Sequence, residues 1–577
     1  MTWTRPRLSA GTKLKECDVM QKQTEADHYD VIVVGAGPTG SALAGDLGRR
    51  GHRVLLVEKT DGIVHDARLH SVSIRTMEFA RKWGIEDALR NCGWPQEHPQ
   101  DVVWATSLAD DEIARIPWPA ISQMVSPAES PTFAQRCPQK WFNAILLRFA
   151  QAQPSVTVRL HSEVTAIRDD SDRVEISATQ KDGATRHYTA RFLVACDGSR
   201  SGIRRDLGID VKKSDVWGQS AEVIIRSPEL RDFPLAQTMG RLSLVEPAGM
   251  AVSLLPFDGR DQFRVIVIVS DKEVTESDMT QWIYKIAGRE VNFEFMSPIL
   301  PWYNRETLAA TFRAGNIFLA GDAAHTMPTT GGLGMNTGVQ DSVDLGWKLS
   351  AVLNGWAGET LLESYDYERR MAVRQTASLA SAIYKDKVAL RAQQAEFWQQ
   401  IGKGGVDADI ARKAMGQSLV ATFGREFNNV SASLGYRYEG SAVCVSEAGE
   451  APAVDFDQYV PCARPGHRAP HAWLPDGRST LDLFDMEFTL IVLSESAPGR
   501  EELVRLAADR KIPLAEYVAE PSVIDELRGL YETALALIRP DGHVAWRGNE
   551  ITEPERLLDV ITGSHVGVHH AVQTTLS

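Results

Sequence analysis

The sequence predicts an α/β protein of about three domains, because the chain has 577 residues and a domain usually contains roughly 100 to 200. Two stretches place a glycine-rich turn directly between a buried strand and a helix, as in an α/β sheet. Between them, residues 211 to 309 are strand-rich and lack glycine motifs. We therefore expect one α/β domain that the chain leaves and re-enters, with a sheet-based domain in between.

Composition and charge exclude several classes of protein. Hydrophobic residues are 43% and charged residues 24% of the chain, which is ordinary for a globular protein and excludes wholesale disorder or a coiled coil. The net charge is -14 and the basic residues form no stripe, so we expect no nucleic-acid partner. The apolar run at 263–270 is far shorter than the roughly 18 residues that span a bilayer and predicts a buried strand. We expect no membrane segment.

The cysteines predict reduced thiols and a cytoplasmic location. They are widely separated, with no CxxC and no metal-ligand spacing, and we expect no metal site. Residues 1–28 lack the apolar core of a signal peptide and are expected to form a flexible extension, with Met20 as an alternative natural start. The six cysteines are Cys17, Cys92, Cys137, Cys196, Cys444 and Cys462.

The first glycine motif predicts dinucleotide binding. The sequence DVIVVGAGPTGSALAGDLGRRGHRVLLVEK is a βαβ unit with Gly35, Gly37 and Gly40 in a GxGxxG turn and Glu58 at the tip of the second strand. Such glycines let the backbone approach a pyrophosphate at a helix N-terminus, and the acid accepts hydrogen bonds from ribose. The alternative is a turn needed only for helix packing. This motif alone leaves FAD and NAD open.

The second motif, GDAAHTMPTTGGLGMNTG at 321–338, favours FAD. Asp322 follows a buried strand, where its carboxylate can accept from a ribityl or ribose hydroxyl. The glycines bring peptide N–H groups toward one point, and Met335 and Asn336 open a helix whose positive end faces that point. A flavin ring that gains negative charge on reduction needs this support. A flexible glycine linker fits poorly, because a buried strand and an amphipathic helix flank the motif.

With FLVACDGSRSGIR at 192–204, the two glycine motifs resemble the class A FAD-dependent aromatic hydroxylases in order and spacing across about 29–400. RPGHRAPHAWL and LIRPDGHVAWRG, in the C-terminal part, further resemble the phenol, 2,4-dichlorophenol and 3-(3-hydroxyphenyl)propionate hydroxylase branch. The resemblance implies a glutathione-reductase-type FAD-binding domain, an inserted β-sheet substrate domain and a C-terminal thioredoxin-like domain.

This organisation divides the chain into consecutive segments. After the extension at 1–28, the FAD-binding domain is expected in three parts. Residues 104–138 are expected to cross to the substrate domain, and residues 211–309 are expected to form it. The three parts are 29–103, 139–210 and 310–439, the last with a helical region, and 440–577 is the expected thioredoxin-like domain. Because that tail has no CxxC, it cannot exchange dithiols and is expected to serve packing or a homo-oligomer contact.

The resemblance also implies the reaction and further residues. NADH or NADPH reduces FAD, O2 adds to the flavin at C4a, and the resulting C4a-hydroperoxyflavin transfers one oxygen atom to a phenolic or related small aromatic substrate. Asp197 lies in the motif with which relatives link FAD to nicotinamide, Arg68 matches an arginine near their flavin, and Gln139 matches a glutamine beside FAD. The chain has a single GxGxxG in the right context, so we expect no separate Rossmann domain for NAD(P)H.

The resemblance places two catalytic groups and one more glycine at the reacting edge. His70 matches the position of a base beside the substrate hydroxyl, Pro328 is expected to face the reacting edge of the flavin, and Gly334 belongs to the flavin loop. Full proton transfer from a phenol of pKa about 10 to a histidine of about 6.5 costs roughly 5 kcal/mol, so partial transfer or a second polar partner must help. A purely structural histidine is the alternative for His70.

Other outcomes stay open on the same scaffold. Epoxidation or simple oxidation would use the same flavin site, whereas the GWxWxIP signature of flavin halogenases is absent. A flavin-binding interaction protein without turnover is the alternative from another class. His325 has no partners at zinc spacing and is expected to be structural or adjacent to the flavin.

Overall fold

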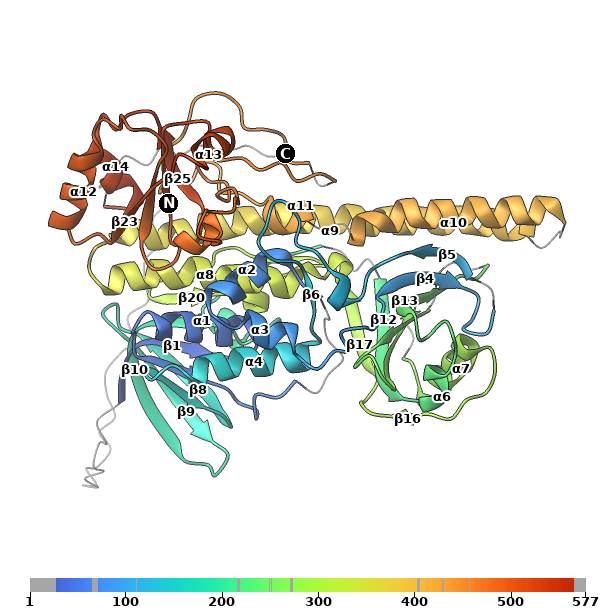
Figure 1. Ribbon diagram of the computed structural model, residues 1–577. Helices are drawn as coiled ribbons and strands as arrows, with labels where there is room; N and C mark the ends of the chain where they lie inside the picture. Colours follow the sequence, from blue (N-terminus) through green and yellow to red (C-terminus); the bar gives the residue numbers. More distant parts are fainter. Residues whose placement is uncertain are drawn as a thin grey trace, which may run out of the picture.

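The computed structural model describes residues 27–64, 71–110, 112–214, 218–247, 250, 252–269, 273–401, 405–427, 430–455 and 457–564. Within these residues the chain forms two eight-stranded sheets and one four-stranded sheet, together with two small sheets. Helices pack against all three larger sheets (Figure 1). The predicted mixed α/β fold is confirmed.

The first sheet has the strand order β19-β20-β10-β1-β2-β7. Strands β20, β10, β1, β2 and β7 run parallel, and β8 and β9 extend an antiparallel meander from the first half of the long strand β10. The nearly continuous apolar sequences of β2, β20 and the second halves of β1 and β10 explain why both faces of these strands are buried. The bounds are β1 Asp27–Val34, β2 Val54–Val57, β7 Val156–Arg159, β8 Ser162–Asp169, β9 Val174–Gln180, β10 Thr185–Ala195, β19 Arg313–Ala314 and β20 Ile317–Leu319.

Helices α1 (Pro38–Arg49), α4 (Gln139–Gln151) and α8 (Leu333–Leu353) pack beside one another on this sheet. Small residues of α1 permit the close approach, since a Cβ on Gly45 would lie 2.3 Å from the ring of Phe149. Two shorter helices, α2 (Ile74–Lys82) and α3 (Glu86–Arg90), contribute to the same core.

The second sheet has the order β16-β12-β15-β14-β13-β4-β5, with β17 beside β12. Helix α7 (Glu276–Ala287) covers one face, where apolar side chains of both elements form a separate core, and α6 (Pro228–Arg231) lies nearby. The expected boundary at residue 103 falls inside β4, all of which pairs within this sheet. The bounds are β4 Asp101–Ala105, β5 Glu112–Ile116, β12 Gly218–Arg226, β13 Met239–Leu244, β14 Val252–Pro256, β15 Gln262–Val269, β16 Glu294–Phe295 and β17 Leu300–Asn304.

Two small sheets mark the crossings between the larger ones. Strands β11 (Val211–Lys213) and β18 (Thr307–Ala309) pair antiparallel where the chain leaves and returns, and β21 (His325–Thr326) pairs with β18. Strands β3 (Ser71–Val72) and β6 (Gln135–Arg136) pair in the same way on either side of β4 and β5.

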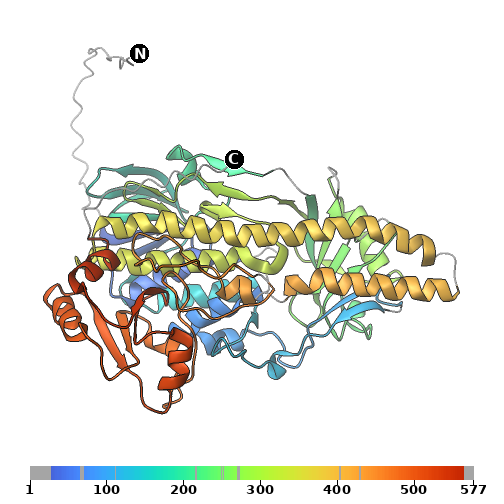
Figure 2. The same cartoon turned by 90° about the horizontal axis from the view of Figure 1, so that it is seen from above.

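A long antiparallel helix pair, α9 (Glu359–Ile401) and α10 (Val406–Phe427), runs from the first sheet past the second (Figures 1 and 2). After α11 (Val430–Leu434), the C-terminal part forms the four-stranded sheet of order β23-β22-β24-β25. Its elements are β22 Phe488–Val492, α12 Arg500–Asp509, β23 Leu514–Val518, α13 Ile524–Tyr531, β24 Leu535–Ile538, β25 Val544–Gly548 and α14 Pro554–Ile561. In the described part of the chain, no helix is both long and apolar enough to cross a membrane.

Candidate functional site

The three sequence motifs meet at one edge of the first sheet. In the parallel register, Val34 pairs with both Val57 and Ala195, and Ala195 pairs with Leu319, so the carboxyl ends of four strands are level. The carboxyl edge of an open parallel sheet is where ligands bind in α/β proteins. Three of these strand ends lead directly into residues of the predicted motifs, Gly35, Glu58 and Cys196. Ala320 follows the fourth strand end and directly precedes the motif at 321–338.

The three glycines of the first turn serve different purposes. Gly35 has φ +106°, and a Cβ there would lie 2.3 Å from the carbonyl oxygen of Cys196. A Cβ on Gly40 would lie 1.9 Å from the carbonyl oxygen of Gly35, so helix α1 needs that glycine to approach the turn. A Cβ on Gly37 would meet no protein atom within 4 Å. Packing therefore explains Gly35 and Gly40, whereas Gly37 borders open space at the start of α1, which suits a pyrophosphate.

Glu58 is fixed beside this turn. One carboxylate oxygen, Oε2, accepts from the backbone N–H of Ala36 at 2.9 Å, and the other, Oε1, accepts from the N–H and the hydroxyl of Thr60 at 2.8 and 2.7 Å. A carboxylate has about four acceptor positions, so the half-buried Glu58 retains one for a ribose hydroxyl. Its position and free acceptor fit the adenosine half of a dinucleotide.

The second motif ends in an uncapped helix N-terminus. Gly331 and Gly332 both adopt left-handed backbone conformations, with φ +74° and +65°, and bring the chain into α8 at Leu333. No side chain caps this helix, so the N–H groups of its first turn are open to an acceptor from a ligand. Gly334 and Met335 lie half-buried in that first turn. This geometry suits the electron-rich end of a reduced flavin.

The side chain of Asn336 is fully engaged within the protein. Its Oδ1 accepts from the N–H of Ser73 at 2.9 Å and from the hydroxyl of Thr76 at 2.8 Å. Its Nδ2 donates to the carbonyls of Ser71 and Gly332 at 3.1 and 2.8 Å. Two accepted and two donated bonds use the whole capacity of a side-chain amide. The side chain therefore joins α8 to α2 and cannot also bind a cofactor.

Asp341, which the sequence analysis did not identify, fixes the turn after β20. Its Oδ2 accepts from the N–H of Gly321 at 2.9 Å and contacts Nε2 of His325 at 2.7 Å, and its Oδ1 accepts from Nε of Arg369 at 2.7 Å. Burial would raise the pKa of Asp341, but His325 and Arg369 hold this pKa below the usual aspartate value. In the sequence Asp341 stands between Gln340 and Ser342, so no local pattern marked it as a buried acid. His325 is buried and stacks on Phe312.

The 192–204 motif reaches the same turn. Nη1 of Arg204 donates to the carbonyl of Ala323 at 2.5 Å, and the Ser201 hydroxyl accepts from the N–H of Arg204. Asp197 Oδ2 accepts from the N–H of Ile203 at 3.3 Å, while its Oδ1 is buried without a hydrogen-bond partner among the described residues. This unpaired, buried carboxylate oxygen at the carboxyl edge of the first sheet could accept a hydrogen bond from a ligand.

The remaining predicted residues are spread around this edge. Pro328 is buried in the second motif, Asp322 is exposed at its start, and Gln139 is a buried residue that begins α4. Arg68 and His70 lie outside the described residues. Among the residues that the structure describes, no three His, Cys, Asp or Glu side chains form a group that could hold a metal ion.

Comparisons with known proteins agree with this geometry. Residues 28–380 match a family model described as an FAD binding domain, and residues 463–564 match the C-terminal domain of aromatic-ring hydroxylases. Aklavinone 12-hydroxylase RdmE of Streptomyces purpurascens is 30% identical, covering 91% of this chain and 96% of its own. Phenol 2-monooxygenase of a Pseudomonas species is 28% identical, covering 94% and 93%.

A solved structure shares the architecture along most of the chain. The structure of the rebeccamycin biosynthetic enzyme RebC with reduced flavin superposes with a TM-score of 0.84 at 33% identity. It covers 94% of this chain and all of its own.

Proposed function

This chain belongs to the FAD-dependent aromatic-ring hydroxylases, and we propose that it hydroxylates a phenolic or related aromatic compound next to an existing hydroxyl group. The family makes it an FAD-dependent monooxygenase. The observation that carries the proposal is the meeting of three sequence motifs at one sheet edge, in a chain that matches both an FAD-binding family model and the C-terminal model of aromatic-ring hydroxylases.

The residues at the sheet edge fit FAD in an extended position. Gly37 and Glu58 would hold its adenosine and pyrophosphate half, and Asp197, Asp322 and the first turn of α8 would hold the rest. Bound FAD supplies the redox chemistry, taking electrons from NADH or NADPH and activating O2. The chain itself supplies backbone N–H groups and an acid for ribose.

The substrate is proposed to lie between the second motif and the second sheet. Glu426 at the end of α10 joins the two, because its Oε1 accepts from the N–H of Gly331 at 3.4 Å and from Nη1 of Arg241 on β13 at 3.5 Å. Pro328 lies three residues before Gly331 and is buried, which supports its place at the reacting edge. His70 is proposed to draw the proton from the substrate hydroxyl, since a phenolate is the better electron donor.

Two finer features of the architecture belong to the same proposal. The second sheet is proposed as an inserted substrate domain, and the C-terminal sheet with α12, α13 and α14 as a thioredoxin-like domain. Support for the thioredoxin-like domain comes from the strand order β23-β22-β24-β25, in which β22 and β23 are parallel and the other pairs are antiparallel.

The C-terminal part is not proposed to carry out thiol chemistry. Burial raises the pKa of Cys444 to about 11, so that thiol stays protonated and inert. A homo-oligomer and a cytoplasmic location remain part of this proposal.

A substrate screen tests the proposed function. Purified protein reconstituted with FAD is mixed with NADH or NADPH and a panel of mono- and polycyclic phenols, and cofactor oxidation and products are measured. We expect one class of phenol to accelerate oxidation and to yield a product heavier by one oxygen atom. Oxidation that no aromatic compound accelerates, with no oxygenated product, would refute hydroxylation and favour simple oxidation or binding alone.

A further inference from the structure

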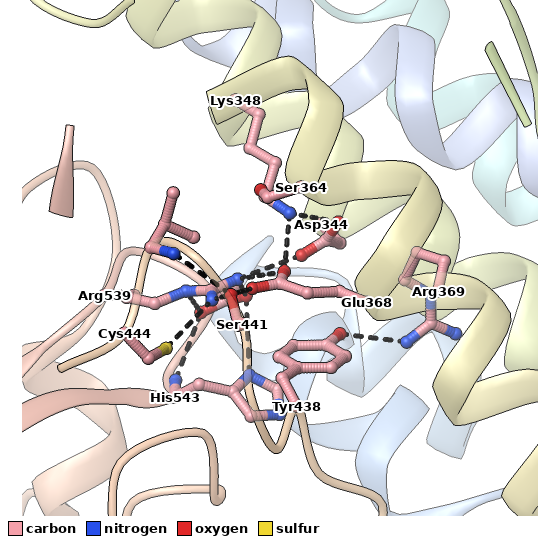
Figure 3. A network of polar contacts seen from close by, with 12 residues as sticks. Asp344, Lys348, Ser364, Glu368, Arg369, Tyr438, Ser441, Cys444, Arg539 and His543 are labelled. Carbon is pink, nitrogen blue, oxygen red and sulfur yellow. Dashed lines mark hydrogen bonds and ion pairs between the residues drawn. The ribbon is translucent and has the colours of Figure 1, made fainter. Parts of the chain in front are cut away.

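Arg539 extends from the C-terminal sheet to helices α8 and α9. It directly follows β24, and its side chain is 0% exposed. Its guanidinium donates to both oxygens of Glu368 on α9, at 2.6 and 2.9 Å, and to Oδ1 of Asp344 on α8 at 3.0 Å. Asp541 closes the same fork from the turn before β25. Figure 3 shows Arg539 reaching toward Glu368 and Asp344. One arginine therefore joins two helices to the C-terminal sheet.

The groups around Arg539 fix the orientation of its guanidinium. Its guanidinium lies 5.2 Å from the ring centroids of both Trp347 and Tyr438. Lys348 donates to Asp344 at 2.9 Å and to Glu368 at 2.5 Å, and Ser441 also donates to Glu368. A planar fork between two rings and three carboxyl groups defines the positions of the attached helices more narrowly than a single ion pair would.

A second buried arginine connects the C-terminal part with α2. Arg468 donates to both oxygens of Glu78, and Arg75 of the same helix donates to Glu78 at 2.8 Å. Arg75 also donates to the carbonyl of Asp541 at 2.7 Å. Arg75, Glu78 and Arg468 are all buried. The two clusters therefore share Asp541, and both helices, α2 and α8, are attached through them to the C-terminal part of the chain.

Helices α2 and α8 are the two that meet at Asn336. Its side chain binds Ser73 and Thr76 at the start of α2 and belongs to the first turn of α8. Asp344 lies two turns further along α8, so a shift of α8 at Asp344 would move the uncapped N–H groups of its first turn. The ion cluster and the candidate flavin site thus lie about two turns apart on one helix.

We propose that Arg539 is a positioning residue for the flavin, holding α8 so that its first turn meets the electron-rich end of the ring. This proposal rests on the proposed function and assigns the C-terminal domain a part in the reaction beyond packing. Stability alone is a weak explanation for the cluster, because well-packed apolar residues often replace a buried ion network without loss of stability. A network that fixes one geometry explains why three carboxylates and two cations are buried here.

The test compares Arg539→Met, Arg539→Lys and a control, Arg505→Met. Arg505 lies on α12 of the same domain and pairs with Glu502 at the surface, where its side chain is 57% exposed. For each variant the FAD dissociation constant, the flavin absorption spectrum and the flavin midpoint potential are measured, none of which needs a substrate. Product formed per NAD(P)H is added once a substrate is known.

Arg539→Met is expected to weaken FAD binding by at least about fivefold, with a shifted flavin spectrum and potential. Arg539→Lys should restore part of each change, because lysine keeps the charge but lacks the fork. Arg505→Met should match the wild type. A folded Arg539→Met protein with wild-type affinity, spectrum and potential would overturn the proposal.

A milder variant guards against misfolding of Arg539→Met. Ser441→Ala removes one donor to Glu368 and leaves every charge in place. Ser441→Ala should shift the flavin spectrum and potential in the same direction as Arg539→Met, but by a smaller amount. If Arg539→Met misfolds and the folded Ser441→Ala variant has an unchanged flavin spectrum and potential, the cluster is purely structural and the proposal is overturned. If the wild-type protein binds no FAD, the proposed function fails first, whatever the variants do.

Discussion

Asp341 holds the turn after β20 through His325: its Oδ2 lies 2.7 Å from Nε2 of the imidazole, and both side chains are almost completely buried. The same oxygen accepts from the N–H of Gly321, immediately before Asp322. A buried acid on α8 thereby fixes the strand end from which Asp322 approaches the proposed cofactor.

Asp341→Asn is expected to destabilise the protein by about 3 to 5 kcal/mol, because it leaves the buried Arg369 without its carboxylate partner. FAD affinity should fall together with stability. Denaturant unfolding and FAD titration check both effects. Asp409→Asn, an exposed acid on α10, serves as the control and should change neither. A wild-type unfolding curve for Asp341→Asn would contradict the role given to this carboxylate.

The first glycine turn separates folding from ligand binding. Gly37→Ala should fold with normal stability without FAD, because its Cβ meets no protein atom, yet bind FAD at least about tenfold more weakly. Gly35→Ala should fail to fold properly, since its Cβ would clash with Cys196 at a left-handed φ. Thermal unfolding without FAD distinguishes the two variants. Equal FAD binding by Gly37→Ala and the wild type would place the pyrophosphate elsewhere.

The ion cluster predicts a pH dependence of stability. Burial raises the pKa of Asp344, Lys348 lowers it and Glu368 raises it again, so that this pKa stands at about 8. In the unfolded chain the same group ionises near pH 3.9. Between these values the folded protein keeps a proton that the unfolded chain loses, so rising pH favours unfolding, and this effect levels off above pH 8.

Asp344→Asn removes that titration. The variant should therefore gain stability relative to the wild type as pH rises from about 5 to 8, by no more than about 1.4 kcal/mol per pH unit. Denaturant unfolding at several pH values measures the difference. A difference that is constant across this range would show that Asp344 is already ionised in the folded protein.

His70→Gln tests the predicted role of His70 as the base beside the substrate hydroxyl. This residue lies outside the part of the chain that the structure describes. Loss of a general base commonly costs about a hundredfold in rate, so kcat should fall by that order. The rise of wild-type kcat with pH should flatten in the variant, while FAD affinity stays unchanged. If kcat and its pH profile are both preserved, His70 is structural.

Local patterns predicted the strands, turns and helices at this sheet edge, because the signals for each motif lie within about 30 residues of one another. The sequence did not predict which charges are buried. Arg539 and Glu368 are 171 residues apart and resemble any exposed pair until the fold joins them. Asn336 was placed correctly in the helix start, but only the structure shows that its side chain is fully occupied by Ser73, Thr76, Ser71 and Gly332.

Isotope labelling tests the central claim most directly. The FAD-loaded enzyme turns over its best phenol from the screen under 18O2 with NAD(P)H, and the product is analysed by mass spectrometry. We predict one 18O atom in each product molecule, with the second oxygen atom released as water. A product oxygenated from solvent water, or a substrate oxidised without gaining oxygen, would contradict monooxygenation by this chain.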